Sequence, residues 1–300
     1  MTAKDAHLPL SHVLLAVAVM AVWGSNFVVI KVALAHLPPL LFATLRFALA
    51  LLPAVFFLKR PPVPWSHLAA YGVLIGAGQF GLLYIAMEHS ISPGLASLVV
   101  QTQVFFTIGL SMWLTSERVR LFQWFALALA AAGLVLIVAN RGGDVTPLGL
   151  MLVLAAALCW AGGNLVAKAG GEVNMLAYVV WASLFAVPPL LVLSILFEGL
   201  PAIETGLADA DPLTWAAVLY QSLGNTMFGY ASWGWLLARH PAATVAPFAL
   251  LVSVFGMSLS TVLLHEPLQT WKLLAAALVL SGLALNLAWP RLRAAVAMRE

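Results

Sequence analysis

Two stretches of the chain place tryptophan, asparagine and lysine side chains within two helical turns of one another. The first reads Trp23-Gly-Ser-Asn26-Phe-Val-Val-Ile-Lys31 and the second reads Trp160-Ala-Gly-Gly-Asn164-Leu-Val-Ala-Lys168. Residues three or four positions apart share one face of a helix. Tryptophan offers a flat apolar surface with one donor, asparagine offers an amide, and lysine can pair with a carboxylate. We expect Trp23, Asn26, Trp160, Asn164 and Lys168 to bind an amphipathic zwitterion.

Three further side chains are candidates for the same binding site. Gln101 interrupts an apolar stretch, and an amide without a partner in hydrocarbon is costly, so it should face a cavity or another helix. Tyr84 and Trp233 lie near glycines, where aromatic faces could form a slot for a planar ring. The alternative for all these residues is structural: tryptophans in interfacial belts, amides bonded across helices, and aromatic rings in the core.

Pro247 is a candidate hinge. A proline inside a helix removes one backbone donor and frees a carbonyl, which often kinks the helix. The same kink can also be a static feature of packing, and the sequence does not separate the two interpretations.

These residues must be positioned by membrane helices, because apolar segments of about twenty residues fill the chain. Hydrophobic residues make up 63% of the sequence and charged residues 8%, far below the roughly 25% charged residues of soluble domains. Such segments span the hydrocarbon as helices, which satisfy their own backbone polar groups. The sequence predicts an all-α integral membrane protein with ten transmembrane helices, over residues 12–34, 39–58, 67–88, 93–114, 121–139, 147–168, 174–197, 212–237, 241–264 and 270–289.

Basic residues in the connecting loops predict the orientation. With a cytoplasmic N-terminus, the inner loops and tails carry Lys4, Lys59, Arg60, Arg118, Arg120, Arg239, Arg291, Arg293 and Arg299. The outer loops carry only Arg141 and Lys272. Because basic residues in short loops favour the inside, both termini are predicted to be cytoplasmic. The net charge of +3 therefore reflects topology and does not indicate nucleic-acid binding.

The two halves of the chain resemble each other. The Trp-Asn-Lys stretches recur, Ser92-Pro93-Gly94 corresponds to His240-Pro241-Ala242, and a glutamate follows each at a matching distance. Since five is an odd number, a second set of five helices enters the membrane in the opposite direction. We predict two five-helix repeats of inverted topology, residues 1–140 and 141–300, with the binding site near the midplane between them.

These motifs resemble the drug/metabolite transporter superfamily, and in particular its ten-helix EamA-type group. The resemblance is carried by the Trp-Gly-x-Asn-Phe…Lys pattern, by Leu45-Arg46-Phe47, by the proline-rich start of the fourth helix and by Glu117. It covers nearly the whole chain and is strongest to aromatic amino-acid exporters of the YddG type. It implies two inverted bundles, alternating access and export of amino acids or related metabolites from a bacterial cytoplasm.

The sequence also argues against other classes of function. Cys159 is the single cysteine and the seven histidines are dispersed, so no metal cluster, cofactor or activated nucleophile is expected, and the protein should not be an enzyme. There is no Walker sequence for ATP. No acidic residue lies in the middle of a predicted helix, which favours facilitated diffusion or exchange over proton antiport. His12 and His89 are the residues that could still carry protons.

We therefore predict an exporter of aromatic and other neutral amino acids in the bacterial inner membrane. The alternative is an exporter of drugs or other hydrophobic metabolites with the same fold, and a receptor or sensor is a third, weaker alternative. The expected partners are a small-molecule substrate and the lipid bilayer, with the protein a monomer or a weak homodimer.

Overall fold

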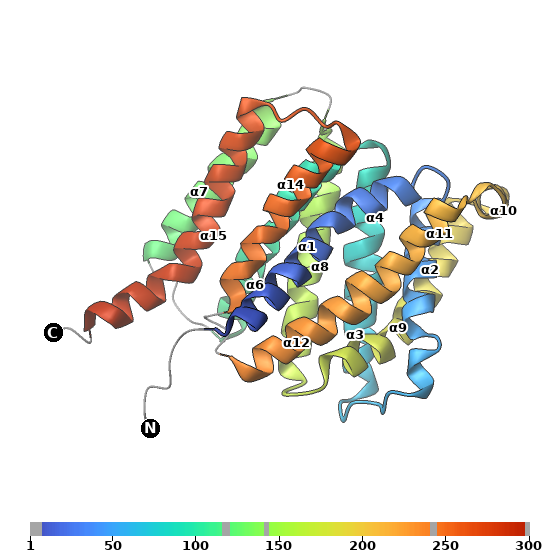
Figure 1. Ribbon diagram of the computed structural model, residues 1–300, viewed down its shortest axis with the longest axis horizontal. Helices are drawn as coiled ribbons and strands as arrows, with labels where there is room; N and C mark the ends of the chain where they lie inside the picture. The colour runs from blue at the N-terminus through green and yellow to red at the C-terminus, as the bar shows by residue number, and fades with distance from the viewer. Residues whose placement is uncertain (1–7, 116–120, 141–143, 241–244, 298–300) are drawn as a thin grey trace.

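The computed structural model describes residues 8–115, 121–140, 144–240 and 245–297, with the side chains of residues 114, 115, 238, 246 and 286–297 outside that description. Over these residues the chain is a bundle of helices (Figure 1). In chain order the elements are α1 Leu10–Ala33, α2 Pro39–Leu51, η1 Ala54–Phe56, α3 Trp65–Gly72, η2 Val73–Gly81, α4 Leu82–His89, α5 Pro93–Val99, η3 Val100–Thr102, α6 Gln103–Thr115, α7 Leu121–Ala139, α8 Pro147–Ala169, α9 Met175–Phe197, α10 Leu200–Asp209, α11 Pro212–Leu219, η4 Tyr220–Phe228, α12 Gly229–Arg239, η5 Ala246–Leu250, α14 Leu251–Leu264 and α15 Thr270–Ala297.

The prediction of an all-α membrane protein is confirmed. Eight helical stretches are long and apolar enough to cross a membrane: Leu10–Ala33, Pro39–Phe56, Trp65–His89, Pro93–Trp113, Leu121–Ala139, Pro147–Ala169, Met175–Phe197 and Pro247–Leu264. The remaining two predicted spans correspond to the continuous stretch α11–η4–α12 and to α15, whose apolar part is Thr270–Leu285. The first of these is the more polar because η4 carries Gln221, Ser222, Asn225 and Thr226.

One helix was not predicted. Residues 198–211 were expected to be a long outer loop, but α10 occupies most of it. Pro201 stands in its first turn, where a missing backbone donor costs nothing, and the helix combines apolar and acidic residues. Figure 1 shows α10 at the end of the bundle farthest from the start of α1. We call this end, with the connections at 34–38 and 265–269, the distal end, and the end where α1 and α3 begin the proximal end.

Three helices change their helical pitch near the middle of their spans, and a fourth does so near its proximal start. The third and eighth spans each contain nine residues of π-helix, η2 and η4, and the fourth and ninth contain short 3-10 segments, η3 and η5. Mid-helix changes of this kind free backbone groups and re-aim side chains, and they are frequent at functional sites. The candidate site lies among these four segments.

Tight helix contacts hold the bundle together. α1 packs along α14, α2 along α9 and α7 along α15 (Figure 1). At the first of these crossings Gly24 has no room for a side chain, because a Cβ there would lie 2.4 Å from Cβ of Phe255 and 2.8 Å from the carbonyl oxygen of Val252. Small residues that allow such approach are the usual means of association between membrane helices.

Candidate functional site

A cavity of about 370 Å³ opens between the helices, on the proximal side of η2 and η4 and beside η3 and η5. It is lined by Trp23, Tyr71, Gln101, Gln103, Val104, Trp160, Asn164, Met175, Tyr230, Trp233, Gly234, Leu237, Ala249, Leu250, Val252 and Leu283. Both halves of the chain contribute to it. We call it the central cavity.

A smaller chamber of about 50 Å³ adjoins the central cavity on its inner side. The two share Trp23, Trp160, Tyr230 and Val252 as lining residues. The chamber is further lined by Asn26, Phe27, Gln79, Phe80, Leu83, Val100 and Asn225. It brings the π-helical segments η2 and η4 to the same space as the middle of α1.

Aromatic rings form one wall of the central cavity. The ring of Trp23 lies 5.7 Å from those of both Tyr230 and Trp233, at interplanar angles of 58° and 57°. Its indole Nε1 donates a hydrogen bond to the carbonyl oxygen of Asn225 at 3.1 Å. Gly229 makes room for this ring, since a Cβ there would lie 2.3 Å from Nε1 of Trp23. The indole is therefore fixed in position by α12 and η4.

Amide side chains form the polar part of the site and are tied to each other. Asn164 donates to Oε1 of Gln103 at 3.0 Å, and Gln101 donates to the carbonyl oxygen of Ala249 at 2.9 Å. In the small chamber Asn225 donates to Oδ1 of Asn26 at 2.8 Å. An amide has two donors and an acceptor with two lone pairs, so each retains capacity for a ligand.

The described lining of the central cavity carries aromatic, amide and apolar groups but no Asp, Glu, Lys or Arg. An ion without an opposite charge would be strongly disfavoured in such surroundings. The cavity is therefore suited to a molecule of no net charge, with a flat or apolar part against the rings and polar ends against the amides.

The structure brings together most of the residues predicted from the sequence. Trp23, Gln101, Trp160, Asn164 and Trp233 line the central cavity. Asn26, which is buried, lines the small chamber. Their role in binding a substrate stays a prediction.

Two predicted residues lie elsewhere. Lys168 is exposed in the last turn of α8 and does not line either space, because the helix has by then reached the proximal end. Tyr84 is fully buried, stacks on Phe42 at 4.8 Å and accepts a hydrogen bond from Arg46, so it belongs to the packed interior. Pro247 stands near the start of η5, just before α14, where it accompanies a 3-10 segment.

Sequence reasoning did not single out Tyr71, Tyr230, Gln79 or Asn225. The signal for Asn225 was present, because the run Gln221-Ser222…Asn225-Thr226 is the most polar part of any predicted span. Tyr71 and Tyr230 gave no such signal, since single tyrosines are common in helix cores.

Arg46 is a buried cation beside the small chamber. It is 1% exposed, donates to the hydroxyl groups of Tyr84 and Thr226, and holds its guanidinium 3.6 Å from the centre of the Phe80 ring. Its partners in the structure are hydroxyl groups and aromatic faces.

Ionic contacts gather at the distal end. Lys272 lies 3.0 Å from both Asp144 and Glu266, and Glu266 also accepts hydrogen bonds from Ser92 and from the backbone nitrogen of Gly94. Glu266 thus fixes the start of α5. Glu117, its predicted counterpart, lies outside the described residues.

A second carboxylate performs a similar role nearby. Glu198 accepts from the backbone nitrogens of Leu40 and Leu41 at the start of α2, at 2.5 and 3.0 Å, and from Ser194. Burial raises the pKa of this carboxyl, an effect that these hydrogen bonds oppose. Between α1 and α11, His36 forms a hydrogen bond with Thr214 at 2.9 Å. Together these contacts tie the two halves of the chain at the distal end.

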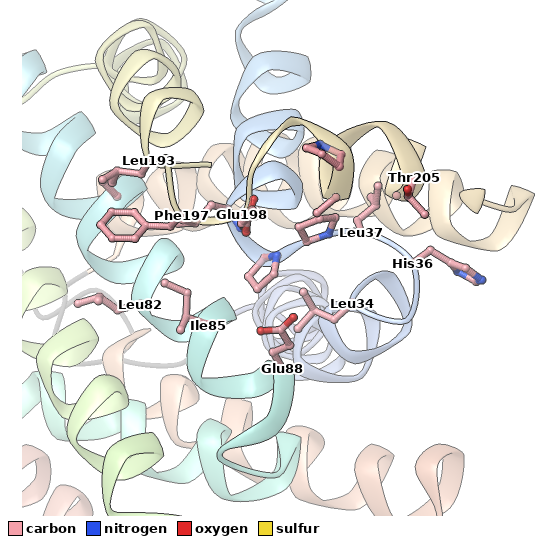
Figure 2. A pocket seen from close by; sticks show the side chains of 17 residues that line it. Leu34, His36, Leu37, Leu82, Ile85, Glu88, Leu193, Phe197, Glu198 and Thr205 are labelled. Carbon is pink, nitrogen blue, oxygen red and sulfur yellow. The ribbon is translucent and has the colours of Figure 1, made fainter. Parts of the chain in front are cut away.

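A wider cavity of about 970 Å³ also lies at the distal end (Figure 2). Its walls are mainly apolar, from Leu82, Ile85, Leu193 and Phe197, with α10 on one side. Figure 2 shows Glu88 and Glu198 within it and the His36 ring at its edge. The 77% exposure of Phe197 indicates that this space is a groove open to the surroundings of the bundle. Because it lacks the amides and stacked rings of the central cavity, we regard the central cavity as the candidate site.

Comparisons with known proteins agree with this architecture. The model of the EamA-like transporter family matches residues 10–139 and again residues 147–288. A protein of Salmonella typhimurium named probable amino-acid metabolite efflux pump is 44% identical over 93% of this chain and 95% of its own length. A protein of Escherichia coli strain K12 with the same name is 40% identical over 94% of this chain and 96% of its own length.

More distant relatives carry less specific names. An uncharacterized transporter of Bacillus subtilis, YoaV, is 26% identical over 90% of this chain and 94% of its own length. A solved structure described only as a crystal structure of protein superimposes with a TM-score of 0.63 at 19% identity, covering 93% of this chain and 97% of the other. That likeness supports the fold alone.

Proposed function

The chain belongs to the EamA-like transporter family of the drug/metabolite transporter superfamily, and on this premise we propose that it exports amino acids or their metabolites from a bacterial cytoplasm. It is a multi-pass membrane transporter and not an enzyme. The names of the Salmonella and Escherichia relatives support the choice of amino-acid metabolites.

The observation that carries the proposal is the uncharged, aromatic and amide-lined central cavity. A neutral amino acid has no net charge, an apolar or aromatic side chain, and two polar ends that amides and indole nitrogens can bind. Offset stacking against a tryptophan contributes about 0.5–1.5 kcal/mol beyond burial, which favours aromatic side chains. A lipophilic cation, the typical drug substrate, would meet no carboxylate among the described lining residues.

Transport would proceed by alternating access between residues 1–140 and 141–300, as inverted five-helix repeats. Three observations support this. Both parts contribute lining residues, and the third and eighth spans both contain π-helical segments. At the distal end, hydrogen bonds to Glu198 and Glu266 from backbone nitrogens of the first part join the two parts. The central cavity reaches Leu237 and Met175 at the proximal ends of α12 and α9. With both termini in the cytoplasm, this conformation faces the cytoplasm, and Pro247 would act as a hinge during closure.

The driving force would be the substrate gradient. Within the described spans there is one acidic residue, Glu88, at the end of α4. It lines the wide cavity at the distal end and not the central cavity. A carrier coupled to protons usually relays them through a carboxylate or histidine inside the membrane. The histidines of the described spans, His12, His67 and His89, stand in the first or last turn of their helices and do not line the central cavity. Facilitated diffusion or exchange is therefore the simplest mechanism.

The test is exchange of labelled phenylalanine by the purified protein in liposomes, in competition with unlabelled Phe, Trp, Thr, Met, Lys and a lipophilic cation. The proposal predicts exchange that neutral and aromatic amino acids inhibit, with no stimulation by an imposed pH gradient. Inhibition by the cation alone would favour the drug exporter. Uphill accumulation driven by the pH gradient would refute facilitated diffusion.

A further inference from the structure

The guanidinium of Arg46 is a positive charge that the described part of the structure does not neutralise. Its hydrogen bonds go to the hydroxyl groups of Tyr84 at 2.9 Å and Thr226 at 3.2 and 3.3 Å, and no carboxylate of a described residue lies within ion-pair distance. A buried cation normally has an anionic partner, because removing a charge from water is costly. An arginine cannot avoid this cost by losing its proton.

The Phe80 ring lies between the guanidinium of Arg46 and the small chamber. The guanidinium carbon lies 3.6 Å from the centre of the Phe80 ring, and Phe80 lines the small chamber together with Gln79 and Asn225. Thr226, which binds Arg46, directly follows Asn225 on η4. Phe80 and Thr226 both belong to π-helical segments, which are frequent at functional sites.

We propose that Arg46 selects substrates that carry a carboxylate, with Phe80 as the ring that separates the charge from the chamber. In the conformation described, Arg46 acts through its field across the ring, and displacement of the ring lets a carboxylate pair with the guanidinium directly. The amino acid would then bind with its carboxylate toward the small chamber and its side chain against Trp23 and Trp233.

This assignment rests on the proposed function and deepens it by naming what recognises one end of the substrate. It accounts for a feature that packing alone does not explain. A purely structural strut between Tyr84 and Thr226 needs only hydrogen-bond donors, which a neutral glutamine supplies at a lower burial cost. The charge itself has the rings of Phe80 and Phe47 beside it, but no anion among the described residues.

Two variants separate the charge from the hydrogen bonds. Arg46→Lys keeps the charge but loses the forked donor geometry, whereas Arg46→Gln keeps donors and loses the charge. The full-length protein in liposomes is tested with three ligands of one shape: phenylalanine, 3-phenylpropionate without the ammonium, and 2-phenylethylamine without the carboxylate. Their inhibition constants against labelled phenylalanine give the preference for a carboxylate.

We expect Arg46→Gln to reduce the preference for phenylalanine over 2-phenylethylamine by about tenfold or more, the effect of one unit charge within about 10 Å at an effective dielectric constant of about 20. Arg46→Lys should keep most of that preference. Equal loss for all three ligands in both variants, or greater loss in Arg46→Lys, would overturn the assignment and leave Arg46 a structural strut. Phenylalanine exchange by the unaltered protein shows separately that the proposed function holds.

A matched pair of aromatic variants tests the separating ring. Phe80 and Phe47 both face the guanidinium, at 3.6 and 5.2 Å, but of the two only Phe80 lines the described chamber. Phe80→Leu should strengthen inhibition by 3-phenylpropionate several-fold relative to 2-phenylethylamine, and Phe47→Leu should leave this ratio unchanged. The same ratio in both variants would exclude Phe80 as the barrier.

Discussion

Replacing Lys272 by methionine should destabilise the distal end by a measurable amount. Lys272 is 1% exposed and lies 3.0 Å from both Asp144 and Glu266, whose side chains are 20% and 11% exposed. Methionine fills a similar volume but leaves the carboxylates of Asp144 and Glu266 without their shared cation. Removing one partner of a buried pair typically costs about 3–5 kcal/mol, and the partial exposure of Asp144 favours the lower value, about 3 kcal/mol.

The assay is thermal unfolding of the purified protein in detergent, followed by tryptophan fluorescence. By the scale of about 2–4 °C per kcal/mol for chains of this order of length, the melting temperature should fall by about 6–12 °C. Asp144→Asn in the Lys272→Met background should restore part of the loss, because one unpaired charge is removed. Lys59→Met is the control, since Lys59 is exposed at the proximal end. A fall in Lys272→Met no larger than in Lys59→Met would refute the reasoning.

Three further substitutions test the central cavity. Trp160→Ala and Asn164→Ala should each weaken phenylalanine exchange about tenfold without loss of membrane insertion, because each removes a lining group; unchanged exchange in both would remove α8 from the site. Gly229→Ala should displace the Trp23 ring, because Nε1 of Trp23 would lie 2.3 Å from the new Cβ. The half-saturation concentration for phenylalanine should then rise about tenfold. Gly109→Ala is the control, since the Cβ added there meets nothing within 4 Å, and it should leave that concentration unchanged. An equal effect of both glycine variants would contradict the account.

The spans were predictable because the membrane imposes one requirement, a long apolar helix, and the sequence shows it directly. The helix α10 was not predictable on this basis, because a short helix in a connection between spans needs neither that length nor that hydrophobicity. The π-helical segments η2 and η4 could not be predicted from the sequence either. They depend on contacts between distant helices, such as the hydrogen bond from Trp23 to the carbonyl oxygen of Asn225.

The candidate site was predicted in part for a similar reason. Trp23, Trp160 and Asn164 could be found because polar or amphipathic groups in a membrane helix need partners, and their spacing placed them on one face. Lys168 could not be judged from spacing, since only the depth of α8 in the bundle decides which turn reaches the cavity. Tyr84 accepts a hydrogen bond from Arg46, which lies on another helix, and the sequence does not show this pairing.

The most direct test of the account is whether substrate occupies the central cavity. Cys159 is the single cysteine, so Cys159→Ser gives a background in which a cysteine at Leu250, a lining residue, can be labelled with a maleimide. The account predicts that phenylalanine protects Leu250→Cys, with half-protection at its half-saturation concentration for exchange, and leaves the exposed Lys59→Cys unprotected. Unchanged labelling of Leu250→Cys at saturating phenylalanine, in protein that still exchanges it, would contradict the central claim.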